Sequence, residues 1–366
     1  MLIGWLEASL LVRWLLGWIL ALNLPILPAS RPPRQRQVSV LIPARNESAT
    51  LPHLLTALRS QSLKPHEVIV IDDHSVDGTA DIVRQAIDIL PIQLVQSPPL
   101  PEGWCGKTWA LHHGVQASHG DVLVFLDADT EPGPHFLQRL IAQQEQRGGL
   151  LSVQPYHRTE KLYEQLSLLF NLVGLMAVPM GPQCGVAFGP AMATSRSDYD
   201  QAGGHDGVAD KVVEDWFLAH RYEQVGLPVS AWLGGDSIAY RMYPGGLADL
   251  VAGFNKNFAI AAGEVRWPWM VAVLLWLSGL FWAAWCLPAA IFGWPMVGVH
   301  AIGPNVLLYG AFALQLLLVS RRVGRFFWIN LFFPIPVLFF LGVFVLAIVN
   351  LERGQVVWKG RRVKTR

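Results

Sequence analysis

The chain has 366 residues, of which 52% are hydrophobic and 15% charged, and its formal net charge is +1. This length accommodates one sizeable α/β domain and a further part. The hydrophobic content exceeds what a soluble core of that size requires, which predicts lipid-embedded segments. The charge balance gives no reason to expect a nucleic-acid partner. Cys105, Cys184 and Cys286 are far apart and lack CxxC spacing, which argues against a disulfide framework or a zinc site.

Segment 1–28 is predicted to be an N-terminal transmembrane helix. Its apolar run, interrupted at Glu7 and Arg13, is long enough to cross a hydrocarbon layer of about 30 Å. A cleaved signal peptide is the alternative, but the run is longer than a signal h-region and no small-residue cleavage site follows it. The basic linker 29–37 is typical of the cytoplasmic side of a span, so the segment after it is expected in the cytosol.

From residue 38 to residue 245, short β-branched runs alternate with amphipathic stretches. This pattern predicts a cytosolic α/β domain with a mostly parallel, Rossmann-like sheet. Strands are expected at 38–42, 68–71 and 122–126, and helices at 48–61 and 77–88. Because ligands bind beyond the carboxyl ends of parallel strands, the polar clusters at 43–47, 72–77 and 127–130 should converge on one cleft.

Two stretches near this domain are expected to lie at the membrane surface. Residues 162–192 are apolar, but glycines and prolines break them too often for a clean span. Residues 246–267 are interpreted as an amphipathic interface region that leads into the C-terminal helices.

Segment 268–351 is expected to hold C-terminal transmembrane helices, in stretches 268–293, 296–320 and 326–351, before a basic tail at 352–366. Three crossings that start in the cytosol would leave this tail outside, whereas its basic charge favours the cytosolic side. A re-entrant hairpin at 326–351, broken by Pro334 and Pro336, would resolve the conflict. The chain is therefore expected to be a multi-pass protein of the cell (inner) membrane with a cytoplasmic catalytic domain.

Asp127 and Asp129 follow directly after an expected apolar strand. Two carboxylates one residue apart at a strand end can share a hard divalent cation such as Mg²⁺ or Mn²⁺. Such a cation would stabilise the charge that develops on a leaving diphosphate. An acidic, solvated turn is the alternative interpretation, and the strand context favours the metal site.

Acidic residues also follow the first two expected strands. Glu47, Asp72 and Asp73 can accept hydrogen bonds from a base N–H and from ribose hydroxyls. Asp77 and Ser48 precede amphipathic runs and are instead expected to be helix caps.

These motifs, in this order, resemble family 2 glycosyltransferases of the GT-A fold. The resemblance covers most of the chain and rests on PARNE at 43–47, DDHSVDGT at 72–79, GKTWA at 106–110, LDADT at 126–130 and VEDWFLAHR at 213–221. It implies that the first two clusters, with Pro43, Ala44, Glu47, Asp72 and Asp73, hold the nucleoside, which is usually uridine. It also implies that Asp127 and Asp129 address the ribose and the metal–diphosphate, and that Lys107 approaches the donor phosphates. A solvated lysine at a helix entry is the alternative for Lys107.

Glu214 and Asp215 match the position of the family's ED pair. In an inverting displacement a carboxylate must draw the proton from the acceptor hydroxyl, opposite the leaving diphosphate. By resemblance Asp215 is the catalytic base, with Glu214 beside it. Acidic residues placed in a first helical turn by the helix dipole are the alternative.

The chain departs from the processive members of the family, which carry QxxRW after the ED pair. The comparable stretch here is SIAYRMYP at 237–244, in which Arg241 and Tyr243 are candidates to clamp the diphosphate or stack at the acceptor entrance. The missing Gln and Trp favour transfer of a single sugar. Lys256 is a further phosphate candidate, although a snorkelling interfacial lysine is the alternative, and His205 is given no role.

Three further segments narrow the resemblance: WCGKTWA at 104–110, RMYP at 241–244 and WKGR at 358–361. They are similar to bacterial glycosyltransferases that act on terpenoid lipids, namely the carotenoid-acid (4,4'-diaponeurosporenoate) glucosyltransferases and the hopene-associated group. This implies UDP-glucose as donor and a membrane-embedded terpenoid acceptor. A ceramide-like lipid, a polyprenyl phosphate or a polysaccharide is the alternative acceptor. A non-catalytic scaffold that binds a nucleotide sugar is the alternative from another class.

Overall fold

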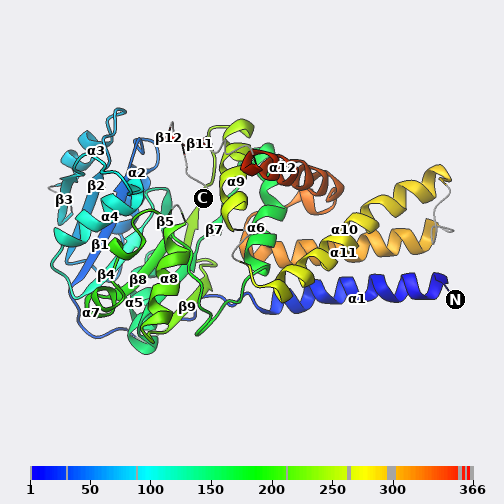
Figure 1. Cartoon of the computed structure of the whole chain (residues 1–366), viewed down its shortest axis with the longest axis horizontal. Helices are drawn as coiled ribbons and strands as arrows, with labels where there is room; N and C mark the ends of the chain where they lie inside the picture. The colour runs from blue at the N-terminus through cyan, green and yellow to red at the C-terminus, as the bar shows by residue number, and fades with distance from the viewer. Residues whose placement is uncertain are drawn as a thin grey trace. The chain divides into compact units, whose positions relative to one another are not determined.

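The computed structural model describes residues 2–29, 32–87, 90–211, 213–261, 265–294, 302–352, 357–358 and 361–362, and no side chain of 2–7, 256–261 or 351–362. Two compact units are present (Figure 1). The sheet unit comprises Pro25–His157 and Pro179–Arg241, and the helical unit comprises Met1–Leu24, Arg158–Val178 and Met242–Arg366.

A seven-stranded sheet forms the centre of the sheet unit, in the order β3-β2-β1-β4-β8-β6-β9. Strands β3, β2, β1 and β4 are parallel neighbours, as are β6 and β9, and only β8 runs antiparallel to β4 and β6. The predicted, mostly parallel sheet is therefore confirmed. The strands are β1 (Val38–Ala44), β2 (Glu67–Asp72), β3 (Ile92–Gln96), β4 (Val122–Leu126), β6 (Leu150–Gln154), β8 (Ala191–Ser195) and β9 (Val229–Leu233), and a small second sheet holds β5 (Thr130–Pro132), β10 (Ile238–Tyr240) and β7 (Tyr156–His157).

Helices cover both faces of the large sheet, which explains why its strands read as nearly continuous apolar runs. Val40 and Ile42 belong to the core on one face, whereas Leu41 belongs to the core on the other. The first core includes α2 (Leu51–Arg59), α3 (Thr79–Ala86) and α5 (Phe136–Arg147), and the second includes α4 (Gly106–Gln116), α7 (Arg196–Gln201) and α8 (Glu214–Gln224), with a short helix η2 (Asp206–Val208) before α8.

The outer edge of β9 is covered by two segments of the same unit. Leu27 donates its N–H to the Leu233 carbonyl at 2.8 Å, and Gly181 donates to the Ala231 carbonyl at 2.8 Å. The stretch 162–192, interpreted from sequence as one surface segment, is thus divided: its first part belongs to the helical unit and its second part to the sheet unit. The glycines and prolines of 179–190 lie in a part of the chain that belongs to the sheet unit, and the membrane-surface location of 162–192 stays a prediction.

In the helical unit, one short apolar helix is enclosed by the longer ones. Phe170 of α6 stacks on Phe254 of α9, with ring centroids 4.2 Å apart, and lies 4.9 Å from Phe340 of α12. The elements of this unit are α1 (Leu2–Leu22), η1 (Leu162–Ser167), α6 (Leu168–Met176), α9 (Leu247–Ala261), α10 (Trp267–Phe292), α11 (Ile302–Val323), η3 (Trp328–Asn330), α12 (Pro334–Glu352), β11 (Val357–Trp358) and β12 (Arg361–Arg362).

The expected break of the helix at Pro334 and Pro336 is wrong, whereas the re-entrant course of 326–351 stays a prediction. Helix α12 runs without interruption from Pro334 to Glu352. Pro334 and Pro336 lie in its first turn, where backbone N–H groups have no intrahelical acceptor and a proline removes no hydrogen bond. The two prolines start this helix and do not break it.

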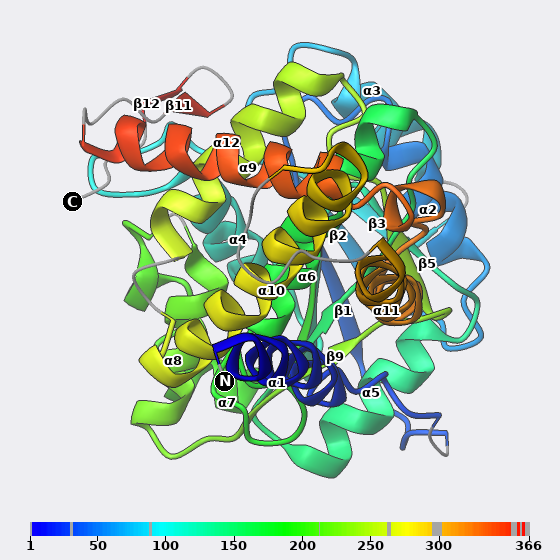
Figure 2. The same ribbon diagram turned by 90° about the vertical axis from the view of Figure 1, so that its right-hand side faces the viewer.

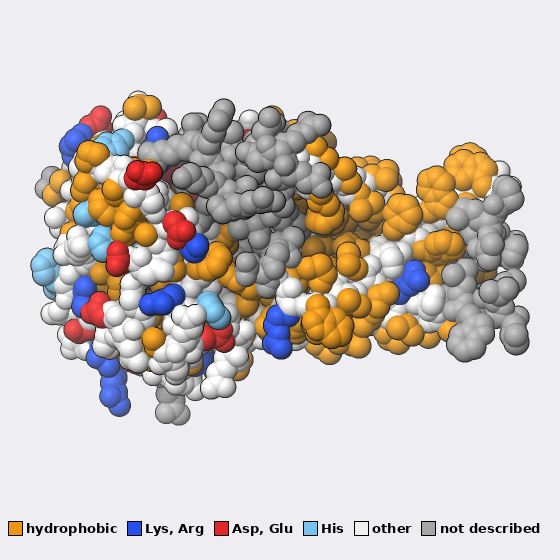
Figure 3. All heavy atoms as spheres, viewed as in Figure 1, with side chains coloured by type: hydrophobic (Ala, Val, Ile, Leu, Met, Phe, Trp, Pro, Cys, Tyr) orange, Lys and Arg blue, Asp and Glu red, His pale blue; other side chains and the backbone are white. Residues whose placement is uncertain are grey.

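Among the described residues, two helices, α10 and α11, are long and apolar enough to cross a membrane. The apolar helical segments Ala8–Leu22 of α1, Leu162–Met176 of η1–α6 and Pro334–Asn350 of α12 are shorter, at 10–17 residues. Hydrophobic side chains cover the visible surface of the helical unit around α10 and α11 (Figure 3). The N-terminal span and the parity of the crossings stay predictions, and the basic tail lies mostly outside the described residues.

A polar contact joins α1, α10 and α11, which run alongside one another (Figures 1 and 2). The Trp276 indole N–H donates to Gln315 Oε1 at 2.9 Å, and Gln315 Nε2 donates to the Trp14 carbonyl at 2.7 Å. Gly17 provides the space for this contact, because a Cβ there would overlap the Trp276 indole and the Gln315 amide.

We therefore expect Gly17→Leu to destabilise the helical unit by about 1–3 kcal/mol, the usual range for overpacking. Thermal unfolding of the purified full chain in detergent measures the effect. Gly310→Leu on α11 is the matched control, because nothing lies within 4 Å of a Cβ there. Equal melting temperatures for the two variants would show that α1 does not pack on α10 and α11 in this way.

Candidate active site

The carboxyl edge of the sheet brings together acidic residues that are distant in sequence. Asp127 follows β4 directly, and its N–H donates to the Pro190 carbonyl at 2.9 Å. Glu214 and Asp215 form the first turn of α8. We call Glu47, Asp127, Asp129, Glu214 and Asp215 the acidic cluster, since each interacts electrostatically with at least one other member.

Lys107, in the first turn of α4, links the two acidic motifs. Its Nζ lies 2.8 Å from Asp127 Oδ1 and 2.9 Å from Glu214 Oε1. The side chains of Lys107 and Asp127 are 34% and 29% exposed, whereas that of Glu214 is 6% exposed. The ammonium group of Lys107 is therefore accessible to a ligand, while its partner Glu214 is buried.

Both oxygens of Asp215 accept a backbone hydrogen bond. Gly189 donates its N–H to Oδ2 at 2.6 Å, and Trp216 donates to Oδ1 at 2.9 Å. A Cβ at Gly189 would lie 3.1 Å from Lys107 Nζ and 3.2 Å from Asp215 Oδ2. In the sequence, Gly189 and Pro190 indicate only a break in an apolar stretch. Their contribution at the site could not be predicted, because β8 is antiparallel and no local motif indicates where the loop before it arrives.

The proximity of like charges alters the titration of the cluster. Burial, with the Asp127 and Glu47 carboxylates, raises the pKa of Asp129 to about 7. Burial, with the neighbouring Glu214, raises the pKa of Asp215 to about 7 as well. Burial also raises the pKa of Asp127, with the Lys107 ammonium acting in the opposite direction. A further positive charge at the acidic cluster would therefore be favourable, because it would stabilise the ionised carboxylates.

Lys107 and Glu214 behave as an ionised pair. Burial by itself would lower the pKa of Lys107, but the Asp127 and Glu214 carboxylates outweigh it and hold this pKa well above its usual value. Burial would likewise raise the pKa of Glu214, yet Lys107 holds it below its usual value. Burial lowers the pKa of the nearby His205 to about 4, so its imidazole is neutral and adds no charge.

The predicted nucleoside residues lie at the ends of β1 and β2. Pro43 and Ala44 are the last residues of β1, and the Ala44 carbonyl accepts from the Asp73 N–H at 2.8 Å. Asp73 Oδ2 lies 3.0 Å from Arg45 Nη1, and Asp72 Oδ1 accepts from the Ser75 N–H at 3.1 Å. These hydrogen bonds fix the orientation of the two carboxyl groups at the sheet edge.

Glu47 is held within its own turn, and Asp77 connects the two neighbouring loops. Glu47 Oε2 accepts from the Thr50 hydroxyl at 2.8 Å. Asp77 accepts the Ser48 N–H at 3.0 Å and the Thr79 N–H at 3.1 Å. Asp77 thus satisfies the first N–H of α3 from the position before its N-cap, Gly78. The predicted cap at Ser48 is wrong, because α2 begins at Leu51 with Thr50 as its N-cap.

The remaining candidates divide between the two units. The pairing of β10 with β5 ends at Tyr240 and Thr130, so Arg241 follows beside the turn that holds Asp129. Tyr243 belongs to the helical unit, where its ring lies 5.2 Å from that of Phe254. The side chain of Lys256 lies outside the described residues. The roles proposed for these three residues stay predictions.

The donor set of the cluster suits a hard divalent cation. Carboxylate oxygens are the ligands that Mg²⁺ and Mn²⁺ prefer, and Mg²⁺ usually keeps waters and takes substrate phosphates as further ligands. Within the described part of the chain, no group of three His, Cys, Asp or Glu side chains could hold a metal ion by itself. Asp127 and Asp129 therefore fit a cation that shares its coordination with a bound diphosphate.

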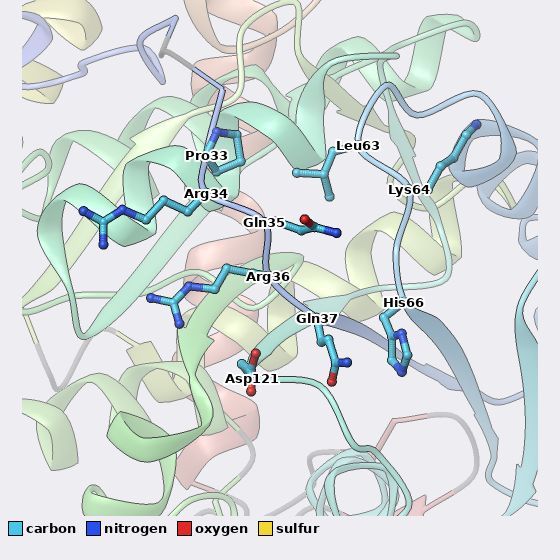
Figure 4. A pocket seen from close by; sticks show the side chains of 9 residues that line it. All are labelled: Pro33, Arg34, Gln35, Arg36, Gln37, Leu63, Lys64, His66 and Asp121. Carbon is cyan, nitrogen blue, oxygen red and sulfur yellow. The ribbon is translucent and has the colours of Figure 1, made fainter.

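A surface hollow elsewhere in the sheet unit lacks this chemistry. It lies at the amino ends of β1, β2 and β4, and Arg34 and Arg36 extend from the linker on one side while Lys64 and His66 lie across from them (Figure 4). Its one carboxylate is Asp121. The acidic cluster lies at the opposite, carboxyl edge of the sheet.

Comparison with known proteins places the chain in a family. The sequence model described as glycosyl transferase family 2 matches residues 39–196. A 4,4'-diaponeurosporenoate glycosyltransferase of Staphylococcus haemolyticus (strain JCSC1435) is 34% identical over 342 residues, which cover 89% of this chain and 88% of that protein. Its counterpart in Staphylococcus aureus (strain MRSA252) is 32% identical over 344 residues, with the same coverage.

The fold has a counterpart among solved structures. It is similar to that of a mannosyltransferase from Pyrobaculum calidifontis, solved in complex with GDP-Man and Mn2+, with a TM-score of 0.57 and 19% identity. The match covers 96% of this chain and 97% of that one. The expected GT-A fold is confirmed, and the extent and identity of the sequence match show that the chain belongs to glycosyl transferase family 2 and is a glycosyltransferase.

Proposed function

We propose that the enzyme moves glucose from UDP-glucose, with inversion, onto a membrane-embedded carotenoid-type acid. One observation carries the proposal: the ammonium group of Lys107 lies 2.8 Å from Asp127, after β4, and 2.9 Å from Glu214, beside Asp215 in α8, so the two acidic motifs share one sheet edge. The choice of acceptor is supported by the two staphylococcal relatives, whose name gives 4,4'-diaponeurosporenoate as the substrate.

The donor would lie along the ends of β1, β2 and β4. Asp72 and Asp73, beside Pro43 and Ala44, would face the uridine. A divalent cation held by Asp127 and Asp129 would supply positive charge to the diphosphate as it leaves. Arg241 would approach the diphosphate from the turn beside Asp129, and Tyr243 is proposed to contact the donor or acceptor entrance.

Asp215 would act on the acceptor. Its two backbone hydrogen bonds orient the carboxylate, and a pKa of about 7 suits a general base at neutral pH. A hydroxyl acceptor needs such a base because its proton must leave as the new bond forms. A carboxylic-acid acceptor is ionised already, so positioning matters more than proton transfer.

The proposed localisation is the cell (inner) membrane, with several crossings and the sheet unit in the cytoplasm. Helices α10 and α11 and the apolar surface around them support it. The helical unit would admit an apolar acceptor from the bilayer to a cytoplasmic enzyme. A ceramide-like lipid, a polyprenyl phosphate or a polysaccharide remains the alternative acceptor, and a non-catalytic scaffold remains the alternative from another class.

The direct test supplies the purified full chain in detergent with Mn²⁺ or Mg²⁺, a carotenoid acid and either UDP-glucose or another nucleotide sugar. Mass spectrometry should detect the glucosylated acid with UDP-glucose. Asp129→Ala should lower the rate by about 10²-fold or more, because a charge that stabilises the leaving group is lost. Asp121→Ala, an exposed carboxylate at the amino edge, is the matched control. Full activity of Asp129→Ala would refute the metal site.

The pH dependence should separate the two acceptor classes. With a hydroxyl acceptor, the rate should fall below pH about 7, where Asp215 is protonated, and Asp215→Asn should lower kcat/KM by about 10²–10⁴-fold. With a carboxylic acid the loss should be much smaller. Rate–pH profiles of the wild type and of Asp215→Asn, each measured on a matched carboxylic acid and alcohol, test this difference. Equal losses of activity on the two acceptors would contradict it.

Gly189→Ala should impair catalysis without unfolding the protein. The added Cβ meets only the mobile ends of Lys107 and Asp215, which shift by a few tenths of an ångström, and misplacement of reacting groups costs up to about 10²-fold in rate. We expect kcat to fall with an unchanged melting temperature. Gly174→Ala, where a Cβ meets nothing within 4 Å, is the control. Unaltered kcat in Gly189→Ala would show that this backbone does not position Asp215.

A further inference from the structure

We propose that Lys107 is a resident counter-cation that competes with the divalent cation for Asp127 and is released from it when the donor diphosphate binds. The inference rests on the proposed use of a metal and a nucleotide sugar at this site. It assigns Lys107 a function before the donor arrives, in addition to the contact with donor phosphates that the family resemblance implies.

The ammonium group of Lys107 contacts a proposed metal ligand. Lys107 Nζ lies 2.8 Å from Asp127 Oδ1, an oxygen that a divalent cation at the two-carboxylate motif would use. An ammonium group and a metal ion on the same oxygen repel each other, because both are positively charged. The position of Lys107 therefore opposes metal binding at Asp127 Oδ1, and movement of Lys107 away from this oxygen would relieve the repulsion.

Lys107 has a second anionic partner, Glu214. Lys107 Nζ also lies 2.9 Å from Glu214 Oε1, and the Glu214 side chain is 6% exposed. This buried carboxylate would retain the ammonium group after Asp127 is released. The four-carbon stem of lysine allows such a movement without a change in helix α4, and the side chain, 34% exposed, is open to an incoming phosphate.

The surroundings of Lys107 are rich in negative charge. Asp127, Glu214 and Asp215 all interact with its ammonium group, while the neighbouring His205 is neutral. Without donor, Lys107 offsets repulsion between the carboxylates after β4 and those of α8. With donor, a diphosphate offers Nζ a new anionic partner and leaves Asp127 to the metal.

The inference predicts that the metal and the nucleotide assist each other's binding through Lys107. Lys107→Met should bind Mn²⁺ without nucleotide at least about tenfold more tightly than the wild type, because the variant lacks the positive charge that repels the metal. A charge at about 4–6 Å changes the proton affinity of a carboxylate by 1–3 pKa units, and we expect an effect of at least the lower size on Mn²⁺ affinity. UDP should then strengthen Mn²⁺ binding less in the variant than in the wild type.

The experiment measures free Mn²⁺ by electron paramagnetic resonance in titrations of the full chain in detergent, with and without UDP. Lys64→Met is the matched control, because Lys64 is exposed and its Nζ contacts only the Arg59 carbonyl among the described contacts. Lys107→Arg keeps the positive charge and should retain weak Mn²⁺ binding in the absence of UDP. This second variant also tests the proposal if Lys107→Met does not fold.

The outcomes separate the inference from the proposed function. Equal or weaker Mn²⁺ binding by Lys107→Met, with normal UDP-dependent binding in the wild type, would overturn the competition alone. Tight Mn²⁺ binding by Lys107→Arg without UDP would also overturn it. If no protein bound Mn²⁺ even with UDP, both the competition and the metal site at Asp127 and Asp129 would be refuted.

Discussion

The structure of the site depends on how repulsion between carboxylates is offset at one sheet edge. Five of them surround the edge, and in a partly buried environment their mutual repulsion is stronger than in water. Lys107 offsets part of it through ion pairs with Asp127 and Glu214. Backbone N–H groups of Gly189 and Trp216 offset another part at Asp215. The remaining repulsion, together with burial, raises the pKa values of Asp129 and Asp215. A further cation at this edge would reduce the repulsion, so its binding is favoured.

Sheet topology is what makes this concentration of charge possible. The parallel strands β1, β2 and β4 end at one edge, which gathers Ala44, Asp72 and Asp127. The antiparallel strand β8 begins where β4 ends, since Ala191 pairs with Leu126. The loop before β8 therefore arrives at the same edge and brings Gly189 against Asp215. A parallel strand in this position would begin at the opposite edge and leave that carboxylate without the Gly189 donor.

Features encoded by local pattern could be predicted from the sequence. The strand at 122–126 and the acidic pair after it follow from apolar periodicity and position, and the cap at Asp77 follows from its place before a helix. Features that depend on distant segments could not be predicted. The ion pair of Lys107 with Glu214 joins residues more than 100 positions apart, and the contribution of Gly189 depends on one antiparallel strand. The helix break expected at Pro334 and Pro336 is wrong because a proline's effect depends on its place in the helix, and Pro334 starts α12.

The same electrostatics bear on the acceptor. A carboxylate acceptor and a diphosphate donor would both bring negative charge to an edge already rich in carboxylates. Their approach is favourable only if positive charge or protons compensate. Lys107 and the metal proposed at Asp127 and Asp129 would supply positive charge, and protonation would make Asp215 partly neutral at physiological pH, because its pKa is about 7. A neutral Asp215 would help an anionic acceptor by removing repulsion, whereas an ionised Asp215 would help a hydroxyl acceptor by taking its proton. The raised pKa is therefore compatible with either acceptor, for opposite reasons, and the protonation state of this carboxyl group during turnover distinguishes them.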